Sequence, residues 1–395
     1  MYHSPAKPSR MLIPVFLYFL AAGIATVMLG PILPALIQRW HIQDAQAGTL
    51  FTASFAGQFI GAWFGARNLR ASVLCGSAIT AAGCFAMGWV GFVSAHVALF
   101  SVGLGLGAGL TAGNIIAGTT VPAARARLIA MLNAAWGVGA ITCPVLVRLF
   151  AGDTRRFFFA TALLLGIASL ISVAIPREPS TRPVSQGDPE SQPLAKSKSS
   201  GLALSPSTLF VFSASLLLYV GVENSLGGWL PSYAIRTNPS LHPSSISLCF
   251  WIAELSGRVL VTLLMAVLGE PTLYRACLAL LILTQILICA IANISAAGVV
   301  TLTILAALSL APLYPLIISF LLARTGTHVR LGPLFATASF GGATLPWLTG
   351  VFSTHFHGLR AGLLVPAAGA ALLLVLSAMI SARPVRPAGT ASLPT

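Results

Sequence analysis

Apolar runs long enough to cross a lipid bilayer follow one another along almost the whole chain, with only short polar connections between them. An α-helix needs about 20 apolar residues to span the hydrocarbon core. Only 8% of the residues are charged and 56% are hydrophobic, whereas a soluble domain carries about 25% charged residues. A backbone inside a bilayer must satisfy its own hydrogen bonds, so the chain forms either helices or a closed barrel. Long continuous runs, without the short alternating segments of a barrel, predict helices.

We predict an all-α membrane protein with twelve transmembrane helices. The segment from Arg177 to Pro206 separates the sixth run from the seventh, and it is rich in Pro, Ser, Gln and charge, as flexible linkers are. This divides the chain into an N-terminal six-helix bundle (1–176), a cytoplasmic linker (177–206) and a C-terminal six-helix bundle (207–395). The predicted spans are 12–37, 46–66, 72–92, 96–120, 127–149, 156–176, 207–234, 245–268, 273–293, 298–322, 331–353 and 359–381.

The distribution of Lys and Arg predicts the orientation in the membrane. With the N-terminus inside, fifteen of the 22 basic residues fall in inner segments and six in outer ones, while Arg258 lies within a span. Inner loops normally carry this excess. We therefore expect a multi-pass protein of the cell (inner) membrane with both termini in the cytoplasm. The net charge of +14 does not indicate nucleic-acid binding, because the basic residues sit singly and form no stripe.

The two halves of the sequence repeat each other. The segment Gly30–Pro34 at the end of the first span matches Gly227–Pro231 at the end of the seventh in its Gly, Leu and Pro positions. An Arg follows each segment at the same distance, as Arg39 and Arg236, so the offset is 197 residues. Spans two and eight match at an offset of 196. The repeat predicts two pseudo-symmetric six-helix bundles of parallel topology.

Short motifs in four spans carry a family resemblance. They are Gly105–Gly107 and Thr111–Asn114 in the fourth span, Leu132–Asn133 with Gly137 in the fifth, Tyr219–Glu223 and Trp229–Leu230 in the seventh, and Leu345–Gly350 in the eleventh. On these residues the whole chain resembles the major facilitator superfamily, and within it the fucose, galactose and glucose proton symporters and their relatives. The resemblance implies the major facilitator fold and transport by alternating access, and we expect a monomer.

The sequence departs from the family pattern at several positions. Gly65 stands where the loop after the second span usually has an Asp, whereas Arg67 and Arg70 remain as candidates for a cytoplasmic gate. The acids tied to proton coupling in the fucose-type symporters align with Gly30 and Leu110. The predicted spans of the N-terminal half therefore contain no acidic residue.

Two of the eight acidic residues lie inside predicted spans, Glu223 in the seventh and Glu254 in the eighth. A charge inside the bilayer is costly, so such residues are candidates for function. Arg258 follows Glu254 by one helical turn and shares its face. The two form either a structural ion pair or a site where Glu254 exchanges its partner for a proton or substrate. Glu223, one turn after Tyr219, is a candidate for substrate binding, coupling or a gate hydrogen bond. The predicted proton-coupling residues are Glu223, Glu254 and Arg258.

Polar and aromatic side chains in the spans predict a site for a small polar ligand. Amides suit paired hydroxyls, and indole faces suit the C–H face of a pyranose. Each amide has the alternative role of a hydrogen bond to a neighbouring helix, and Trp347 has that of an interfacial anchor. The predicted substrate-binding residues are Gln58, Asn114, Asn133, Trp136, Tyr219, Glu223, Asn224, Trp251, Tyr314 and Trp347.

The sequence therefore predicts a secondary active transporter of a small polar solute, with a monosaccharide favoured. Proton symport and facilitative uniport both fit, and an exporter of amphipathic, drug-like or lipid-like compounds is the remaining alternative. The sequence contains no nucleophile–base pair, phosphate loop or metal-ligand spacing, so we expect no enzyme activity, metal or cofactor. The expected partners are the solute, protons and the lipid bilayer, and no nucleic acid.

Overall fold

The computed structural model describes residues 8–120, 124–175, 206–265, 267–325 and 332–380, and within these ranges the regular structure is entirely helical. The first half of the chain contains α1 (Pro8–Val27), α2 (Leu29–Trp40), α3 (Asp44–Gly65), α4 (Leu69–Met87), α5 (Phe92–Thr120), α6 (Arg125–Leu149) and α7 (Thr154–Ser172). The second half contains α8 (Pro206–Thr237), α9 (Pro243–Leu264), α10 (Glu270–Ala290), α11 (Ala296–Leu310), α12 (Leu313–Thr325), α13 (Gly332–His355), α14 (Leu359–Gly362) and α15 (Leu364–Ile380).

Each predicted span corresponds to one helix or to one broken pair, so the all-α membrane prediction is confirmed. The pairs are α1 with α2, α11 with α12, and α14 with α15. Among the described residues, nine segments are long and apolar enough to cross a membrane, or ten with the bent pair α1–α2. Helices α3 and α13 correspond to predicted spans but are not among these segments. The predicted linker lies outside the described residues except for Pro206.

Proline explains where the three broken spans are interrupted. A proline has no N–H to donate, and its ring clashes with the carbonyl four residues earlier. Pro31 lies four residues after Val27, where α1 ends, and the axis bends by 42° into α2. Pro312 falls between α11 and α12, and Pro366 lies four residues after the last residue of α14. The interruption between α11 and α12 leaves Tyr314 in the first turn of α12.

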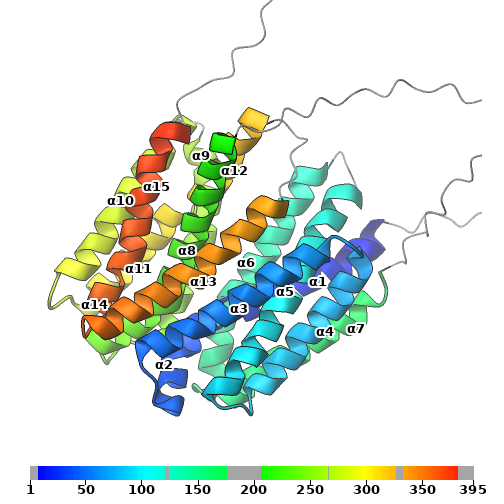
Figure 1. Cartoon of the computed structure of the whole chain (residues 1–395), viewed down its shortest axis with the longest axis horizontal. Helices are drawn as coiled ribbons and strands as arrows, with labels where there is room; N and C mark the ends of the chain where they lie inside the picture. Colours follow the sequence, from blue (N-terminus) through cyan, green and yellow to red (C-terminus); the bar gives the residue numbers. More distant parts are fainter. Residues whose placement is uncertain (1–7, 121–123, 176–205, 266, 326–331, 381–395) are drawn as a thin grey trace, which may run out of the picture.

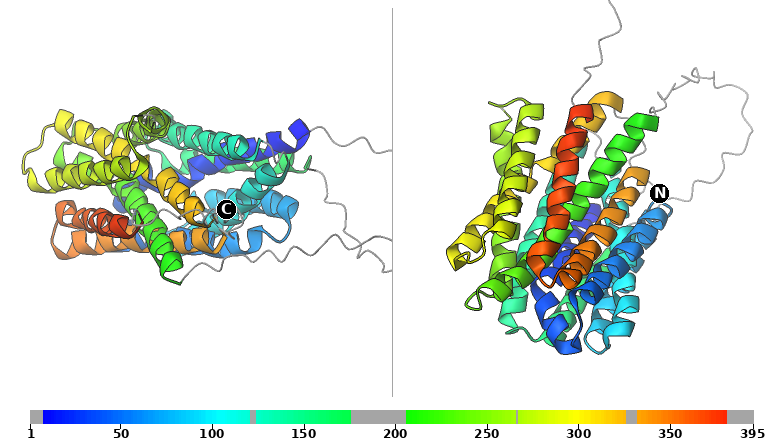
Figure 2. Two further views of the ribbon diagram at one scale, coloured as in Figure 1. Left: turned by 90° about the horizontal axis from the view of Figure 1, so that it is seen from above. Right: turned by 60° about the vertical axis from the view of Figure 1, so that its left-hand side comes forward.

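The helices of residues 8–175 lie on one side and those of residues 206–380 on the other (Figures 1 and 2). Helices α3 and α13 run along each other where the two halves meet (Figure 1). We call the end at which α8 begins and α15 ends the linker end. The opposite end, at which α2 meets α3 and α13 finishes, is the distal end.

Glycines bring α3 and α5 into backbone contact. A Cβ atom built on Gly57 or Gly61 of α3 would lie 2.0 Å from a carbonyl oxygen of α5. From the other side, a Cβ on Gly103 would lie 1.8 Å from the carbonyl oxygen of Ser54, and one on Gly107 would lie 2.0 Å from that of Gln58. Small residues that permit this approach are the usual basis of helix packing in membranes, where no hydrophobic effect drives association.

Close contacts join the two halves toward the distal end. The Thr52 hydroxyl donates to the Ala343 carbonyl at 2.8 Å, and the Ala45 amide donates to the Thr354 hydroxyl at 2.9 Å. A Cβ on Gly30 of α2 would lie 2.3 Å from the carbonyl oxygen of Gly227 on α8. These contacts close the distal end of the interface between the halves.

Candidate functional site

Two acids and one arginine from α8 and α9 form a buried group, here called the central cluster (Glu223, Glu254 and Arg258). The Nη2 atom of Arg258 donates to Oε1 of Glu254, one turn earlier on α9, and lies 3.5 Å from Oε1 of Glu223 on α8. The side chains of Glu223 and Glu254 are only 12% and 3% exposed. One guanidinium thus serves two carboxyl groups from different helices.

Tyrosines complete the α8 side of the cluster. The Tyr219 hydroxyl donates to Oε1 of Glu223 at 2.7 Å, across one turn of α8. Its ring lies 5.5 Å from that of Tyr314, at the break between α11 and α12. Discontinuous helices commonly frame the binding sites of transporters, since their interruption frees backbone and side chains near the bilayer midplane. Tyr314 therefore occupies a position typical of a site residue.

Tryptophans join the cluster to the N-terminal half. The Arg258 guanidinium lies 5.7 Å from the ring centre of Trp136 on α6, within the range of a cation–π contact. Trp136 meets Trp251 of α9 edge to face at 5.8 Å, and its indole N–H donates to the Thr26 hydroxyl of α1 at 3.4 Å. The cluster therefore lies where α6 of one half faces α9 of the other.

The charges of the central cluster do not balance. With both carboxyl groups ionised, two negative charges face one positive charge, which leaves a net charge of −1. An uncompensated charge inside the bilayer costs about 2.5–3.5 kcal/mol on insertion scales. A proton on one carboxyl, or a second cation, removes this cost. The arrangement can therefore exchange a proton or a cationic group while Arg258 moves between two carboxylates.

Two buried donors at the site have no hydrogen-bond partner among the described residues. They are the indole N–H of Trp251 and the Nε–H of Arg258. A buried donor without a partner costs about 1–3 kcal/mol, and such groups point to a role or to an unseen partner. Oxygen atoms of a bound solute would satisfy both donors.

The structure joins seven of the residues predicted from sequence through hydrogen bonds, ion pairs and ring contacts. Trp136, Tyr219, Glu223, Trp251, Glu254, Arg258 and Tyr314 form one connected group. The amides of Asn114, Asn133 and Asn224 each donate to the carbonyl four residues earlier on their own helix, a local role that leaves the amide oxygen as an acceptor. No hydrogen bond, ion pair or ring contact among the described residues links Gln58 or Trp347 to the cluster, and the Trp347 backbone packs on Gly48.

The arginines predicted as a cytoplasmic gate bind within the N-terminal half. Arg70 donates from Nη2 to the Val173 carbonyl at 3.0 Å, at the end of α7. A cation is favourable at a helix C-terminus, where carbonyl groups lack intrahelical partners. The Arg67 guanidinium lies 4.6 Å from the ring centre of Phe64. In this conformation both residues have contacts within their own half, and their gate role stays a prediction.

A charged contact at the distal end was missed by the sequence analysis. Asp44, which lies just outside the predicted span 46–66, starts α3 and accepts two hydrogen bonds of 2.7 Å from Arg236 of α8. The Ser353 hydroxyl of α13 donates to the same carboxylate at 2.6 Å. We call Asp44, Arg236 and Ser353 the distal latch. The recurrence of Arg39 and Arg236 at the repeat offset was the available signal, but it gave no indication of the partner 192 residues away.

Many apolar helices arranged in two halves, with charged side chains buried between them, are typical of membrane transporters. The family model described as Major Facilitator Superfamily matches residues 15–332, and the chain belongs to this superfamily. Members of this superfamily are carriers and not enzymes, as the sequence predicted. The sugar-symporter branch has no equivalent support and remains a proposal.

Known proteins resemble the chain over most of its length. Bypass of stop codon protein 6 of Saccharomyces cerevisiae is 24% identical over 399 residues, covering 91% of this chain and 80% of that protein. A bacterial homolog of the human lysosomal transporter Spinster, in an inward-facing and occupied conformation, has a TM-score of 0.75 at 15% identity and covers 95% of this chain and 97% of its own. A D-xylose–proton symporter has a TM-score of 0.71 at 13% identity, with 93% and 97% covered. At these identities the solved structures establish the fold alone.

Proposed function

We propose that this chain is a proton-coupled carrier of a small polar solute, with a monosaccharide as the substrate, in which the central cluster takes up the proton. The observation that carries the proposal is the imbalance of two buried carboxyl groups against one guanidinium. When a carboxyl group takes up a proton and becomes neutral, the arginine paired with it needs another carboxylate as a partner. Arg258 has two such partners, because it donates to Glu254 and lies 3.5 Å from Glu223.

The side chains around the cluster support a hydroxylated substrate. Trp136, Trp251, Tyr219 and Tyr314 supply aromatic surface, on which the C–H face of a sugar ring packs. The unpaired donors of Trp251 and Arg258 suit hydroxyl oxygens. A solute bound here would touch both halves, and this is what a carrier needs when its halves rock around a fixed site.

The same proposal includes the orientation of the protein in the membrane. The excess of Lys and Arg in the segments at the linker end supports placing that end in the cytoplasm of the cell that carries the protein in its inner membrane. The distal latch and the contacts between α3 and α13 would then close the outer side. The conformation described would accordingly be closed to the outside, and the solute would exchange with the inside.

Ligand-induced thermal stabilisation tests the substrate. Purified protein is heated with a panel of hexoses and pentoses at pH 5.5 and 7.5, and a solute present at 100 times its Kd stabilises the folded state by about 2.7 kcal/mol. We expect one sugar to raise the melting temperature selectively and Trp251→Phe, which removes the unpaired indole N–H, to reduce that shift.

The matched control is Trp89→Phe, since Trp89 is exposed and does not belong to the central cluster. Its ring centre lies 3.4 Å from the Arg155 guanidinium carbon. The response of this variant to the sugar should equal that of the wild type. No response to any sugar, together with a shift from an amphipathic drug or lipid, would replace the sugar proposal with the exporter.

A further inference from the structure

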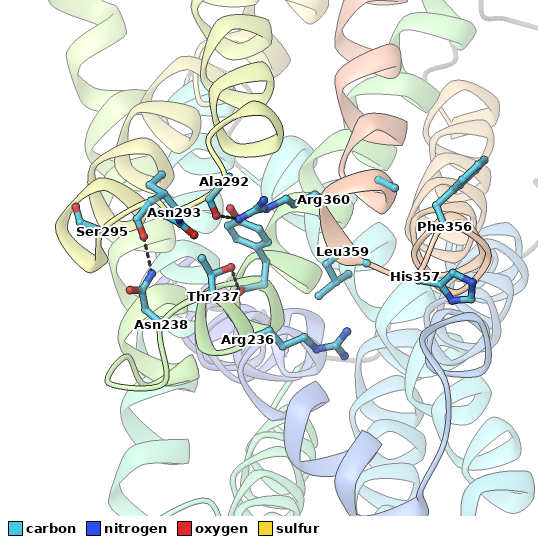
Figure 3. A pocket seen from close by; sticks show the side chains of 14 residues that line it. Arg236, Thr237, Asn238, Ala292, Asn293, Ser295, Phe356, His357, Leu359 and Arg360 are labelled. Atoms are coloured by element: carbon cyan, nitrogen blue, oxygen red, sulfur yellow. Dashed lines mark hydrogen bonds between the residues drawn. The ribbon is translucent and has the colours of Figure 1, made fainter.

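A cavity opens at the distal end of the C-terminal half, apart from the central cluster (Figure 3). It has a volume of about 920 Å³ and lies between the end of α8, the connection from α10 to α11, and the connection from α13 to α14. Arg236, which lines it, follows Glu223 by 13 residues on α8. At 1.5 Å per residue this is about 20 Å along the helix. The cavity is therefore distinct from the central cluster.

The residues that line this distal cavity favour a negatively charged ligand. They include the cations Arg236 and Arg360 together with His357, and no lining residue carries a carboxylate. Neutral polar groups of Thr237, Asn238, Asn293 and Ser295 complete the wall. Guanidinium groups and amides supply hydrogen-bond donors in the geometry that carboxylate and phosphate groups prefer.

Both arginines keep donor capacity for a ligand. The Nη2 atom of Arg360 donates to the Ala292 carbonyl just beyond the end of α10 (Figure 3). Arg236 uses Nη1 and Nη2 for Asp44, yet its side chain is 42% exposed. Each guanidinium has five N–H donors, so neither arginine exhausts its donors on these partners.

Arg236 belongs at once to the cavity wall and to the distal latch. Asp44 is the carboxylate that it now binds, and Asp44 also ties α3 to Ser353 of α13. An anion that enters the cavity and binds Arg236 competes with Asp44 for the same guanidinium. Loss of that pair removes a charged connection between the two halves at the end where they are closed.

We infer that the distal cavity is a binding site for an oxyanion group, a phosphate or a carboxylate, held by Arg360 and Arg236, and that its occupancy weakens the distal latch. A ligand shifts a conformational equilibrium by its difference in affinity for the two states. The anion binds better when Arg236 is free of Asp44, so it favours the state that is open at the distal end. Binding itself does not depend on the proposed transport activity, whereas the effect on the latch rests on the proposed alternating-access mechanism.

The ligand chemistry has two sources, a free anion or the headgroup of an anionic lipid, and two arms of one experiment separate them. In the first arm, full-length protein in neutral detergent is titrated with inorganic phosphate against chloride at equal ionic strength. In the second, the protein is compared in nanodiscs of phosphatidylcholine with and without phosphatidylglycerol. We expect the melting temperature of the wild type to rise in one of the two arms. In Arg360→Gln, the apparent Kd for phosphate should be at least tenfold higher, or the effect of phosphatidylglycerol should be lost.

Controls address charge and folding. Arg155→Gln removes an exposed arginine that stacks on Trp89, outside the cavity, and should leave the anion response unchanged. Arg360→Lys keeps the charge and remains available if Arg360→Gln folds poorly. Monosaccharide stabilisation should be the same in all three variants, which separates failure of this site from failure of the proposed transport function.

Hydrogen exchange of residues 44–52 and 343–354 reports on the latch. In the wild type, the anion should speed hydrogen exchange in these two segments. Asp44→Asn should show the faster exchange without any anion, and exchange in Arg360→Gln should not change when the anion is added. The inference is overturned by no stabilisation in either arm, by an equal response in Arg360→Gln, by a loss of response in Arg155→Gln, or by anion binding that leaves exchange at the latch unchanged.

Discussion

Replacing Arg258 with Gln is expected to abolish sugar accumulation and to lower the stability of the purified protein. The change leaves Glu223 and Glu254 buried side by side with no cation between them. Removal of one partner from a buried ion pair typically costs about 3–5 kcal/mol, because the other charge stays buried without compensation. Thermal unfolding in detergent and uptake into proteoliposomes measure the two effects.

A double variant separates the loss of stability from the loss of transport. The double variant Arg258→Gln with Glu254→Gln removes both charges of the ion pair. Its melting temperature should therefore be close to that of the wild type, yet it should still fail to accumulate sugar. Arg155→Gln, which removes a surface arginine, should behave like the wild type in both assays. A single Arg258→Gln protein with wild-type stability and uptake would show that the central cluster has no role.

Replacing Gly103 with Ala is expected to destabilise the N-terminal half strongly. The new Cβ would lie 1.8 Å from the Ser54 carbonyl oxygen, a backbone atom that moves only if α3 and α5 separate. Overpacking of this kind commonly costs about 1–3 kcal/mol and more where the backbone must shift. The melting temperature should fall by several degrees, and expression of folded protein should drop with it.

Gly166→Ala is the matched control, since Gly166 lies inside α7 and a Cβ there would have no atom within 4 Å. Alanine is favoured over glycine inside a helix by about 0.5–1 kcal/mol, so this variant should be neutral or slightly stabilised. Equal effects of the two substitutions would mean that the close approach of α3 and α5 does not contribute to stability.

The membrane fold could be predicted because hydrophobicity is read directly from the sequence. Twelve apolar runs and a polar segment of about 30 residues define spans and halves without knowledge of contacts. The interruptions beside Pro31, Pro312 and Pro366 were not predicted, since a single proline changes the mean hydropathy of a long apolar run only slightly. They become visible only when the lost backbone hydrogen bond is considered.

Part of the candidate site could be predicted for the same local reason. Tyr219 with Glu223, and Glu254 with Arg258, are each four residues apart, so the helix alone places each pair on one face. The approach of Glu223 to Arg258 depends on how α8 packs on α9, which no spacing encodes. The distal latch is further out of reach, because Asp44 and Arg236 come from different halves. Asn114 and Asn133 were predicted to bind substrate, but the amide of each donates to the carbonyl four residues earlier on its own helix.

Accumulation driven by a pH gradient is the measurement that tests the central claim most directly. Proteoliposomes loaded with buffer at pH 7.5 are placed at pH 5.5 and at pH 7.5, with the radiolabelled sugar that stabilises the protein. The wild type should accumulate sugar only with the gradient, and Glu223→Gln or Glu254→Gln should lose accumulation while retaining exchange of internal for external sugar. Sugar uptake by the wild type that merely equilibrates regardless of the gradient, or accumulation retained in both variants, would contradict proton coupling through the central cluster.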